Sequence, residues 1–515
     1  MTRTSPSTGP AVLAVIAFLT WAHSAPAQTP PVWTQKLPAD VEAFAFAPTG
    51  AVVVQTKAGL FAVEPESGTR LWSRPDVRSY ALVAGTPFAI FTTAAGQSVA
   101  GIESGQDRWS LSSLGFSSIK GQVHLPAAGL MLVYGFTPKS AHTLVACKYL
   151  SGETVWTQTS LFSAPAVASK ASKVEYQAWV LDTETTIVLD PSHDGLLRLD
   201  LKTGELLWRI PESALDSKGG ALEMISTGRV ALGFYDWGKK VLGIDLDSGT
   251  VLWTRKEKFP RPVLQTAPTP SGLLVRGAFE LTSQGSKVSW HPYLALIDPM
   301  TGATKWMVEK EAYGGRSSFL LEGDTLTVAA EDAVASYDAA SGAALNSVKM
   351  TAFSGGESPQ WLERSEDGGL IVSSPQNLRK FEASGALVHS TYLKAPGAGF
   401  LAKFGMFALG AAMAGLTGYS GYGYSTLDVA VDYARARFKA TTSARRYMYV
   451  FTEEPGSESA RFALVRLDKD TGKDTGRLRF NERAPSFRLD WPTGFVVVEH
   501  EGVLAGYRFP PQPDR

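Results

Sequence analysis

The sequence predicts an all-β fold, a β-propeller of four-stranded blades, from three observations. One unit recurs along the chain, in which Ser or Thr and then Gly are followed by three residues and a Trp. Most copies follow an alternating apolar stretch that ends in an acid, as in residues 196–200 and 241–245. Between Trp72 and Trp306 the Trp residues of successive copies lie 37 to 53 residues apart. A four-stranded blade needs roughly 40–50 residues, so each copy fits one blade.

Each part of the unit has a place in a β-hairpin. Alternation is typical of a half-buried strand, and the acid, hydroxyl and Gly cluster forms a turn in which Gly supplies a positive φ. The Trp then has a fixed position on the returning outer strand, where its ring is buried against the neighbouring unit and its N–H finds an acceptor. The predicted blade-docking residues are Gly68, Gly105, Gly152, Gly204, Gly249 and Gly302, with Trp33, Trp72, Trp109, Trp156, Trp208, Trp253 and Trp306.

Three later copies of the unit lack the Trp. Asn346, His389 and Gly476 stand at its position. We interpret His389 as a weakened contact between blades rather than as a ligand, and Asn346 in the same way. The architecture is therefore expected to continue through these copies with altered blade contacts.

The two ends of the chain predict how the ring closes. Residues 32–34 look like an isolated outer strand that carries Trp33, while residues 495–498 and 502–509 look like inner strands without an outer one. We expect the N-terminal strand to complete the last blade, which leaves no sheet edge exposed. Nine units and this closure count ten blades. Propellers of this repeat type more often have eight, so eight to ten blades are expected.

The first 27 residues have the pattern of a secretory signal peptide. Arg3 is their only charged residue, an apolar run follows over residues 11–22, and Ala25-Pro26-Ala27 is a small-x-small cleavage site. We therefore expect residues 1–27 to be removed and 28–515 to form the propeller; the alternative is an uncleaved anchor. No Cys lies near the cleavage site, so no lipoprotein acylation site is expected.

Composition excludes several classes of protein and site. Lys and Arg number 49, as do Asp and Glu, and a nucleic-acid partner is not expected because such binders normally carry a basic excess. The one cysteine, Cys147, excludes an intramolecular disulfide, a Cys-only zinc site and a CxxC redox pair. Cys147 lies in an apolar stretch and is expected to be a buried small residue rather than a reactive thiol.

One segment, residues 396–446, interrupts the repeat. It contains an uncharged run over residues 404–427, first rich in Ala and Gly and then in Gly and Tyr, and a basic cluster follows. Three interpretations remain open: a helix folded against the propeller, a peripheral membrane or partner contact through residues 399–426, and a transmembrane helix. The candidate contact residues are Phe404, Phe407, Met413, Leu416, Arg435 and Arg437.

The strand–(Ser/Thr)-Gly-x-x-x-Trp unit resembles the PQQ-like (pyrroloquinoline-quinone-type) β-propeller repeat. The resemblance covers nearly all of residues 29–515 outside the interrupting segment, and six copies are intact. This repeat occurs in quinoprotein dehydrogenases and in the outer-membrane barrel-assembly scaffold BamB, which binds no quinone. The resemblance implies the fold and does not select a function.

The resemblance to quinoprotein dehydrogenases implies chemistry that this chain lacks in part. Most of those enzymes have a ring of two adjacent Cys residues over the quinone and a calcium or lanthanide ion held by acidic and amide side chains. One cysteine cannot form that ring. Residues 468–474 superficially suggest a calcium loop, but the twelfth position is Arg479 instead of Glu, and the stretch overlaps a repeat turn.

The sequence thus assigns no catalytic, cofactor-binding or metal-ligating residues. The expected function is a non-catalytic, exported scaffold for protein interactions at the bacterial cell envelope. It would reside in the periplasm or be secreted, with membrane association as an option, and its partners would be envelope proteins, including outer-membrane assembly components. The alternatives are a PQQ-dependent dehydrogenase of unusual type and a propeller that binds a ligand in its central funnel.

Overall fold

The structure is a computed structural model that describes residues 29–139, 142–159, 161, 176–179, 186–191, 195–215, 222–235, 240–255, 263–281, 289–309, 317–330, 332–395, 446–454, 462–480, 486–490, 493–500 and 502–509. The expected signal peptide lies outside these residues. So does the interrupting segment, except for Arg446.

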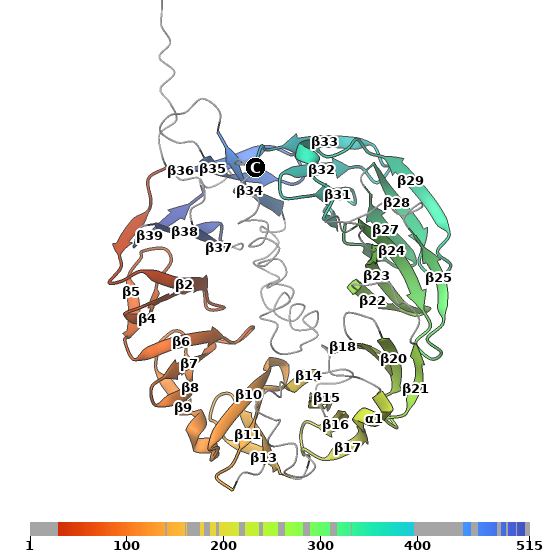
Figure 1. Cartoon of the computed structure of the whole chain (residues 1–515). Helices are drawn as coiled ribbons and strands as arrows, with labels where there is room; N and C mark the ends of the chain where they lie inside the picture. The colour runs from red at the N-terminus through yellow and green to blue at the C-terminus, as the bar shows by residue number, and fades with distance from the viewer. Residues whose placement is uncertain are drawn as a thin grey trace, which may run out of the picture.

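The described strands form a ring of antiparallel sheets, nine with four strands and one with three (Figure 1). The chain runs around the ring in order, so its first and last strands meet. The predicted β-propeller is confirmed, and its nine four-stranded blades lie within the expected range of eight to ten. The three-stranded sheet stands between the eighth blade and the closing blade in chain order and is called the ninth sheet below.

Blades 1 to 4 consist of β2 (Val41–Phe46), β3 (Val52–Thr56), β4 (Gly59–Val63) and β5 (Arg70–Arg74); β6 (Val77–Leu82), β7 (Phe88–Thr93), β8 (Gly96–Gly101) and β9 (Asp107–Ser110); β10 (Ser118–Leu125), β11 (Leu130–Phe136), β12 (His142–Lys148) and β13 (Thr154–Gln158); and β14 (Tyr176–Trp179), β15 (Thr186–Pro191), β16 (Leu196–Asp200) and β17 (Leu206–Ile210).

Blades 5 to 8 consist of β18 (Leu222–Thr227), β19 (Val230–Tyr235), β20 (Lys240–Asp245) and β21 (Val251–Arg255); β22 (Val263–Thr269), β23 (Gly272–Leu281), β24 (Ser289–Ile297) and β25 (Thr304–Val308); β26 (Leu320–Glu322), β27 (Thr325–Ala329), β28 (Ala333–Asp338) and β29 (Ala344–Lys349); and β30 (Trp361–Arg364), β31 (Leu370–Ser373), β32 (Asn377–Phe381) and β33 (Leu387–Tyr392).

The ninth sheet consists of β34 (Tyr447–Glu453), β35 (Phe462–Asp468) and β36 (Asp474–Phe480), and the closing blade of β37 (Ser486–Asp490), β38 (Phe495–His500), β39 (Val503–Arg508) and β1 (Trp33–Lys36). The short helical elements of the described residues are η1 (Leu111–Leu114), η2 (Pro126–Ala128), α1 (Glu212–Leu215) and η5 (Ser354–Gly356). None of the helices in the described part is long and apolar enough to cross a membrane.

The N-terminal strand closes the ring, as predicted. β1 pairs antiparallel with β39, from Trp33 opposite Gly506 to Lys36 opposite Val503. It thereby becomes the fourth and outer strand of a blade whose other three strands end the chain. The closing blade therefore joins two chain segments that lie far apart in the sequence.

The apolar core lies between neighbouring sheets. Leu132 and Leu144 of blade 3 share one buried cluster with Leu197 and Leu199 of blade 4. The middle strands are buried on both faces, and every residue of β3 and β4 is buried. The apolar pattern of the repeat therefore reflects sheets that each pack against two neighbouring sheets, one on each face.

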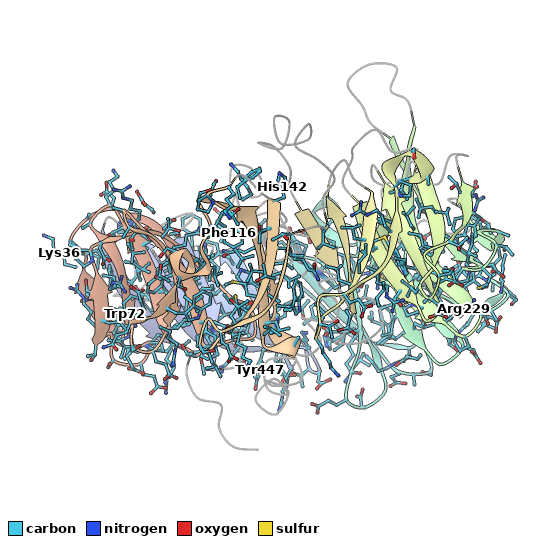
Figure 2. All side chains as sticks on the ribbon, turned by 90° about the horizontal axis from the view of Figure 1, so that it is seen from below. Lys36, Trp72, Phe116, His142, Arg229 and Tyr447 are labelled. Atoms are coloured by element: carbon cyan, nitrogen blue, oxygen red, sulfur yellow. The ribbon has the colours of Figure 1, made fainter. Side chains whose placement is uncertain are left out.

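The ring has two faces with different connections. We call the turn face the one that carries the turns between the first and second strands and the repeat turns between the third and fourth strands. The loop face carries the turns between the second and third strands and the connections from one blade to the next. In Figure 2, Phe116 and His142 mark the loop face and Tyr447 lies at the opposite edge.

The ninth sheet contains the second, third and fourth strands of a blade. The repeat turn at Gly472 joins β35 to β36, which makes them the third and fourth strands, and β34 pairs with β35 as a second strand does. Among the described residues this sheet has these three strands.

Candidate functional site

The predicted Trp and Gly residues meet in pairs across the blade interfaces. A Trp on the outer strand of one blade packs against the repeat Gly of the next blade. The pairs are Trp33–Gly68, Trp72–Gly105, Trp109–Gly152, Trp156–Gly204, Trp208–Gly249, Trp253–Gly302 and Trp306–Gly342. A Cβ atom on any of these glycines would lie only 2.4 to 2.6 Å from the indole ring. The glycine thus serves both the turn, with its positive φ, and the docking of the ring.

Each of these indoles also donates a hydrogen bond to the repeat turn of the next blade. Trp72 Nε1 donates to the carbonyl of Ile102 at 2.6 Å, and Trp208 Nε1 donates to that of Leu246 at 2.7 Å. Trp33, Trp109, Trp156, Trp253 and Trp306 make the equivalent bond. Ring packing and the hydrogen bond together fix both the distance and the rotation between adjacent blades.

Two interfaces replace the Trp in different ways. His389 takes its place fully, because its ring lies against Gly472 and its Nε2 is 2.9 Å from the carbonyl oxygen of Lys469. Asn346, in contrast, is exposed, and Val348, two residues later on the same strand, packs against Gly385. The sequence offered a signal for Val348, since it is the next apolar residue on the same face of the strand.

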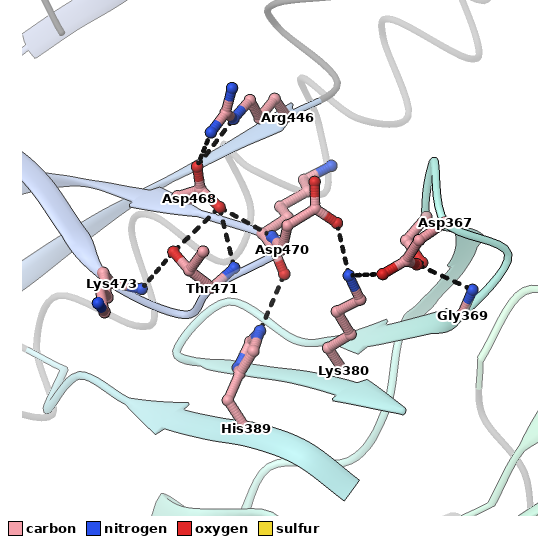
Figure 3. Close-up of polar contacts among 11 residues, drawn as sticks. Asp367, Gly369, Lys380, His389, Arg446, Asp468, Asp470, Thr471 and Lys473 are labelled. Carbon is pink, nitrogen blue, oxygen red and sulfur yellow. Dashed lines mark hydrogen bonds and ion pairs between the residues drawn. The ribbon is translucent and has the colours of Figure 1, made fainter. Parts of the chain in front are cut away.

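Charged side chains reinforce the interface between blade 8 and the ninth sheet (Figure 3). The Lys380 side chain is only 5% exposed, and its Nζ lies 2.6 Å from Asp367 Oδ2 and 2.9 Å from Asp470 Oδ1. Burial alone would lower the pKa of Lys380, but the two carboxylates outweigh it and raise that pKa. Lys469 adds an ion pair with Glu363 at 2.6 Å. These groups hold the two sheets together.

The acidic residues of the repeat accept hydrogen bonds within their own turns. The Oδ1 atom of Asp468 accepts hydrogen bonds from the backbone N–H groups of Asp470 and Thr471 at 3.0 and 2.9 Å. Its Oδ2 atom lies 2.8 Å from Arg446 Nε. Burial raises the pKa of Asp468, yet these hydrogen bonds and the Arg446 charge hold it below its usual value. The residues that superficially suggest a calcium loop thus form a repeat turn.

Acid should weaken the ring through these carboxylates. Lys380 holds the pKa of Asp367 well below its usual range, and the Ser341 hydroxyl lowers that of Asp338. A carboxylate with a depressed folded-state pKa stabilises the fold above its unfolded pKa of about 3.9, and this stability is lost as the pH falls through the folded value. We expect urea midpoints to hold down to about pH 5 and then to fall towards about pH 2. The fall should be shallower in Asp367→Asn, and a midpoint that stays level in acid would contradict this account.

Two side chains that could act as a nucleophile or a base are shielded from solvent, Cys147 fully and His124 in part. The Cys147 side chain has no exposed surface, and burial raises its pKa to about 12. The His124 ring stacks on Tyr149, with its Nδ1 2.7 Å from the phenol oxygen, and burial lowers its pKa to about 4. At neutral pH Cys147 is therefore a thiol in the core, and His124 is a neutral, half-buried imidazole.

The candidate contact residues of the interrupting segment lie outside the described residues. These are Phe404, Phe407, Met413, Leu416, Arg435 and Arg437. Within the described part, no group of three or more His, Cys, Asp or Glu side chains is arranged to hold a metal ion. The residues that the structure does bring together are the Trp–Gly pairs and the charged cluster around Lys380.

Comparison with known proteins identifies the repeat. The family model described as "Outer membrane protein assembly factor BamB" matches residues 95–266. The crystal structure of BamB from Moraxella catarrhalis is 13% identical, covers 77% of this chain and 99% of that one, and has a TM-score of 0.33. A quinohemoprotein alcohol dehydrogenase from Comamonas testosteroni is also 13% identical, with coverages of 68% and 72% and a TM-score of 0.31. No curated protein matches the chain.

The matched family model begins in blade 2 and ends in β22 of blade 6, so it covers the part of the ring with three complete Trp–Gly interfaces. The family-model match therefore covers repeat units that the sequence analysis had identified. The chain is a β-propeller of PQQ-like repeats that resembles BamB.

Proposed function

We propose that this chain is an exported, non-catalytic β-propeller that acts as a scaffold for protein interactions at the bacterial cell envelope. The observation that carries the proposal is the match of residues 95–266 to the family model of an outer-membrane assembly factor. The partners would be envelope proteins, including components of outer-membrane assembly. Export rests on the expected signal peptide at residues 1–27.

The chemistry of the repeat supports a scaffold. Its most frequent reactive groups, the acids and hydroxyls of the turns, accept and donate hydrogen bonds within those turns, as Asp245 does with Ser248. Its Trp residues make the contacts between blades. The repeated residues therefore build a rigid ring, and a rigid ring is well suited to hold a binding surface in place.

We further propose that the partner or membrane contact is made through residues 399–426, with Phe404, Phe407, Met413 and Leu416 as its apolar residues. Photo-crosslinking in cells tests this proposal, with the photoreactive group at Phe407 and Met413 and a control at Leu150, which is 67% exposed in a repeat turn. We expect envelope proteins to be captured from the first two positions and not from the control. Capture of nothing but this chain itself would contradict the proposal.

Membrane contact has its own test. Deletion of residues 399–426 should reduce the share of the protein that sediments with membranes, because it removes the apolar surface. A deletion of residues 140–141 in the β11–β12 connection serves as a control for shortening a loop. Unchanged partitioning after deletion of 399–426 would rule out the membrane contact and leave the scaffold proposal standing.

The competing candidate is a PQQ-dependent dehydrogenase, since such enzymes carry the same repeat. It predicts a quinone absorbance in the purified protein, or dye reduction with an alcohol after addition of PQQ and calcium. The scaffold proposal predicts neither. The third candidate, a ligand-binding propeller, predicts a small molecule bound in the central funnel.

A further inference from the structure

The strand β33 forms the outer edge of blade 8, on the periphery of the ring (Figure 1). It pairs with β32, and the register between the two strands is continuous from His389 to Tyr392. The Leu393 N–H donates to the carbonyl of Gln376 at 3.0 Å, on the β32 side. Backbone groups alternate along a strand, so Ser390 and Tyr392 direct theirs away from β32. Among the described residues no strand pairs with β33 on that side.

Charged residues usually protect such an edge from pairing with another chain. Each outer strand that the structure describes, except β13 and β33, contains Asp, Glu, Lys or Arg. The β5 strand, for example, begins and ends with Arg. The sequence of β33, Leu-Val-His-Ser-Thr-Tyr, has no such residue and no Pro. The edge of β33 therefore lacks the residues that normally prevent strand pairing.

The β33 strand also exposes apolar surface. Leu387, Val388 and Tyr392 are 52%, 49% and 40% exposed. In β13, the other uncharged outer strand, Val155 is the one large apolar residue that is exposed, at 38%. The position of the Tyr392 ring is fixed by η5, because a Cβ atom on Gly355 would lie only 2.8 Å from the phenol oxygen. An open edge, no charge and a fixed apolar side chain thus occur together on β33.

We propose that β33 binds the β33 strand of a second copy of this chain, antiparallel, about a two-fold axis that passes through the pair of Ser390 residues. A two-fold contact joins the same surface of both copies. A charged strand would therefore bring like charges together, which destabilises a strand pair. Because β33 carries no Asp, Glu, Lys or Arg, it meets its own copy without this cost.

The register about Ser390 matches the exposed residues with one another. Val388 of each copy lies opposite Tyr392 of the other, and Ser390 lies opposite Ser390. Pairs of an aromatic and a β-branched residue, and pairs of hydroxyl residues, stabilise neighbouring strands. An axis one residue later would place Val388 opposite Lys394, and an axis one residue earlier would place Tyr392 opposite Ala386. The register about Ser390 is therefore favoured over its two neighbours.

The pairing determines how the two rings lie. In each copy β33 starts after the repeat turn at Gly385, on the turn face, and ends at the loop face. Antiparallel pairing thus places the turn face of one ring beside the loop face of the other, and the two copies of blade 8 form one continuous sheet. A ladder of six residues buries little surface, so we expect a dimer that separates on dilution.

Sedimentation velocity of the purified protein tests the dimer. We expect the average sedimentation coefficient to rise from the monomer towards the dimer value between about 1 and about 100 µM protein. Val388→Lys should weaken association at least about tenfold, because it places a charge beside the apolar Tyr392 of the other copy on both sides of the axis. The matched control is Val155→Lys, at the same repeat position of β13, and it should leave association unchanged.

Disulfide formation between copies tests the register and does not depend on the Lys variants. The Cα atoms of two opposite residues lie about 5.5 Å apart, within the range of a disulfide, so Ser390→Cys should form covalent dimers on mild oxidation. Val388→Cys should not, because its two copies are about 13 Å apart along the ladder. Thr157→Cys on β13 serves as a control, and Cys147 does not interfere because it is buried.

Four results would overturn the proposal. The first is a protein that stays monomeric at about 100 µM, and the second is an equal effect of the two Lys variants. The third is covalent dimers of Val388→Cys or Thr157→Cys that are as abundant as those of Ser390→Cys. The fourth is a disulfide in cells between Ser390→Cys and a different envelope protein in place of a second copy, which would assign the edge to that protein.

Discussion

Replacement of Trp208 by Ala is expected to lower the free energy of unfolding by about 3–5 kcal/mol. The Trp208 side chain is 8% exposed, packs against Gly249 of the next blade and donates its indole N–H to the carbonyl of Leu246. Truncation removes a large buried apolar area and leaves a cavity between the two blades. The cavity cannot close because the neighbouring strands fix the distance between the blades. Urea unfolding of the purified protein measures the loss.

Two matched variants separate the sources of this effect. Trp208→Phe keeps a ring in the interface but removes the indole donor, so it should cost less than the Ala variant, with about 1 kcal/mol from the hydrogen bond. Leu252→Ala removes a side chain that is 37% exposed on the outer strand of blade 5 and should cost well under half of the Trp208→Ala loss. Equal, small losses in all three variants would contradict the docking role of Trp208.

The second large effect is expected at Gly249, the glycine that packs against Trp208. Gly249→Ala should cost about 2–4 kcal/mol, because its Cβ would lie 2.6 Å from the Trp208 ring and because Gly249 has a φ of +70°. Gly228→Ala is the matched control. Gly228 has a φ of +81° with no atom within 4 Å of a Cβ, so this variant carries only the backbone cost of about 1–2 kcal/mol. If the two variants lost the same stability in urea, the tight contact at Gly249 would be energetically irrelevant.

Much of this fold could be predicted from the sequence because the repeat is local. The turn, the positive φ of its Gly and the position of the Trp all follow from one short stretch, and the isolated strand at Trp33 predicted the closure that β39 provides. Copies without the Trp were expected to have altered contacts. His389 nevertheless keeps the ring packing and a polar contact with the next turn.

The features that the sequence did not predict depend on contacts between distant residues. The partner of Trp208 is a glycine of the following copy, and the charges of Lys380, Asp367 and Asp470 look in the sequence like ordinary surface charges. Only the register of two adjacent sheets brings these three side chains together.

A double-mutant cycle on Trp208 and Gly249 tests most directly the central claim that the repeated Trp and Gly are a single contact between blades. The costs of Trp208→Ala, Gly249→Ala and the double variant are measured by urea unfolding. Without the indole ring the added methyl group has room, so we predict that the double variant loses less than the two single losses combined, with a coupling of about 1–3 kcal/mol. Losses that add to within about 0.5 kcal/mol would show that the two residues act independently and would contradict the account.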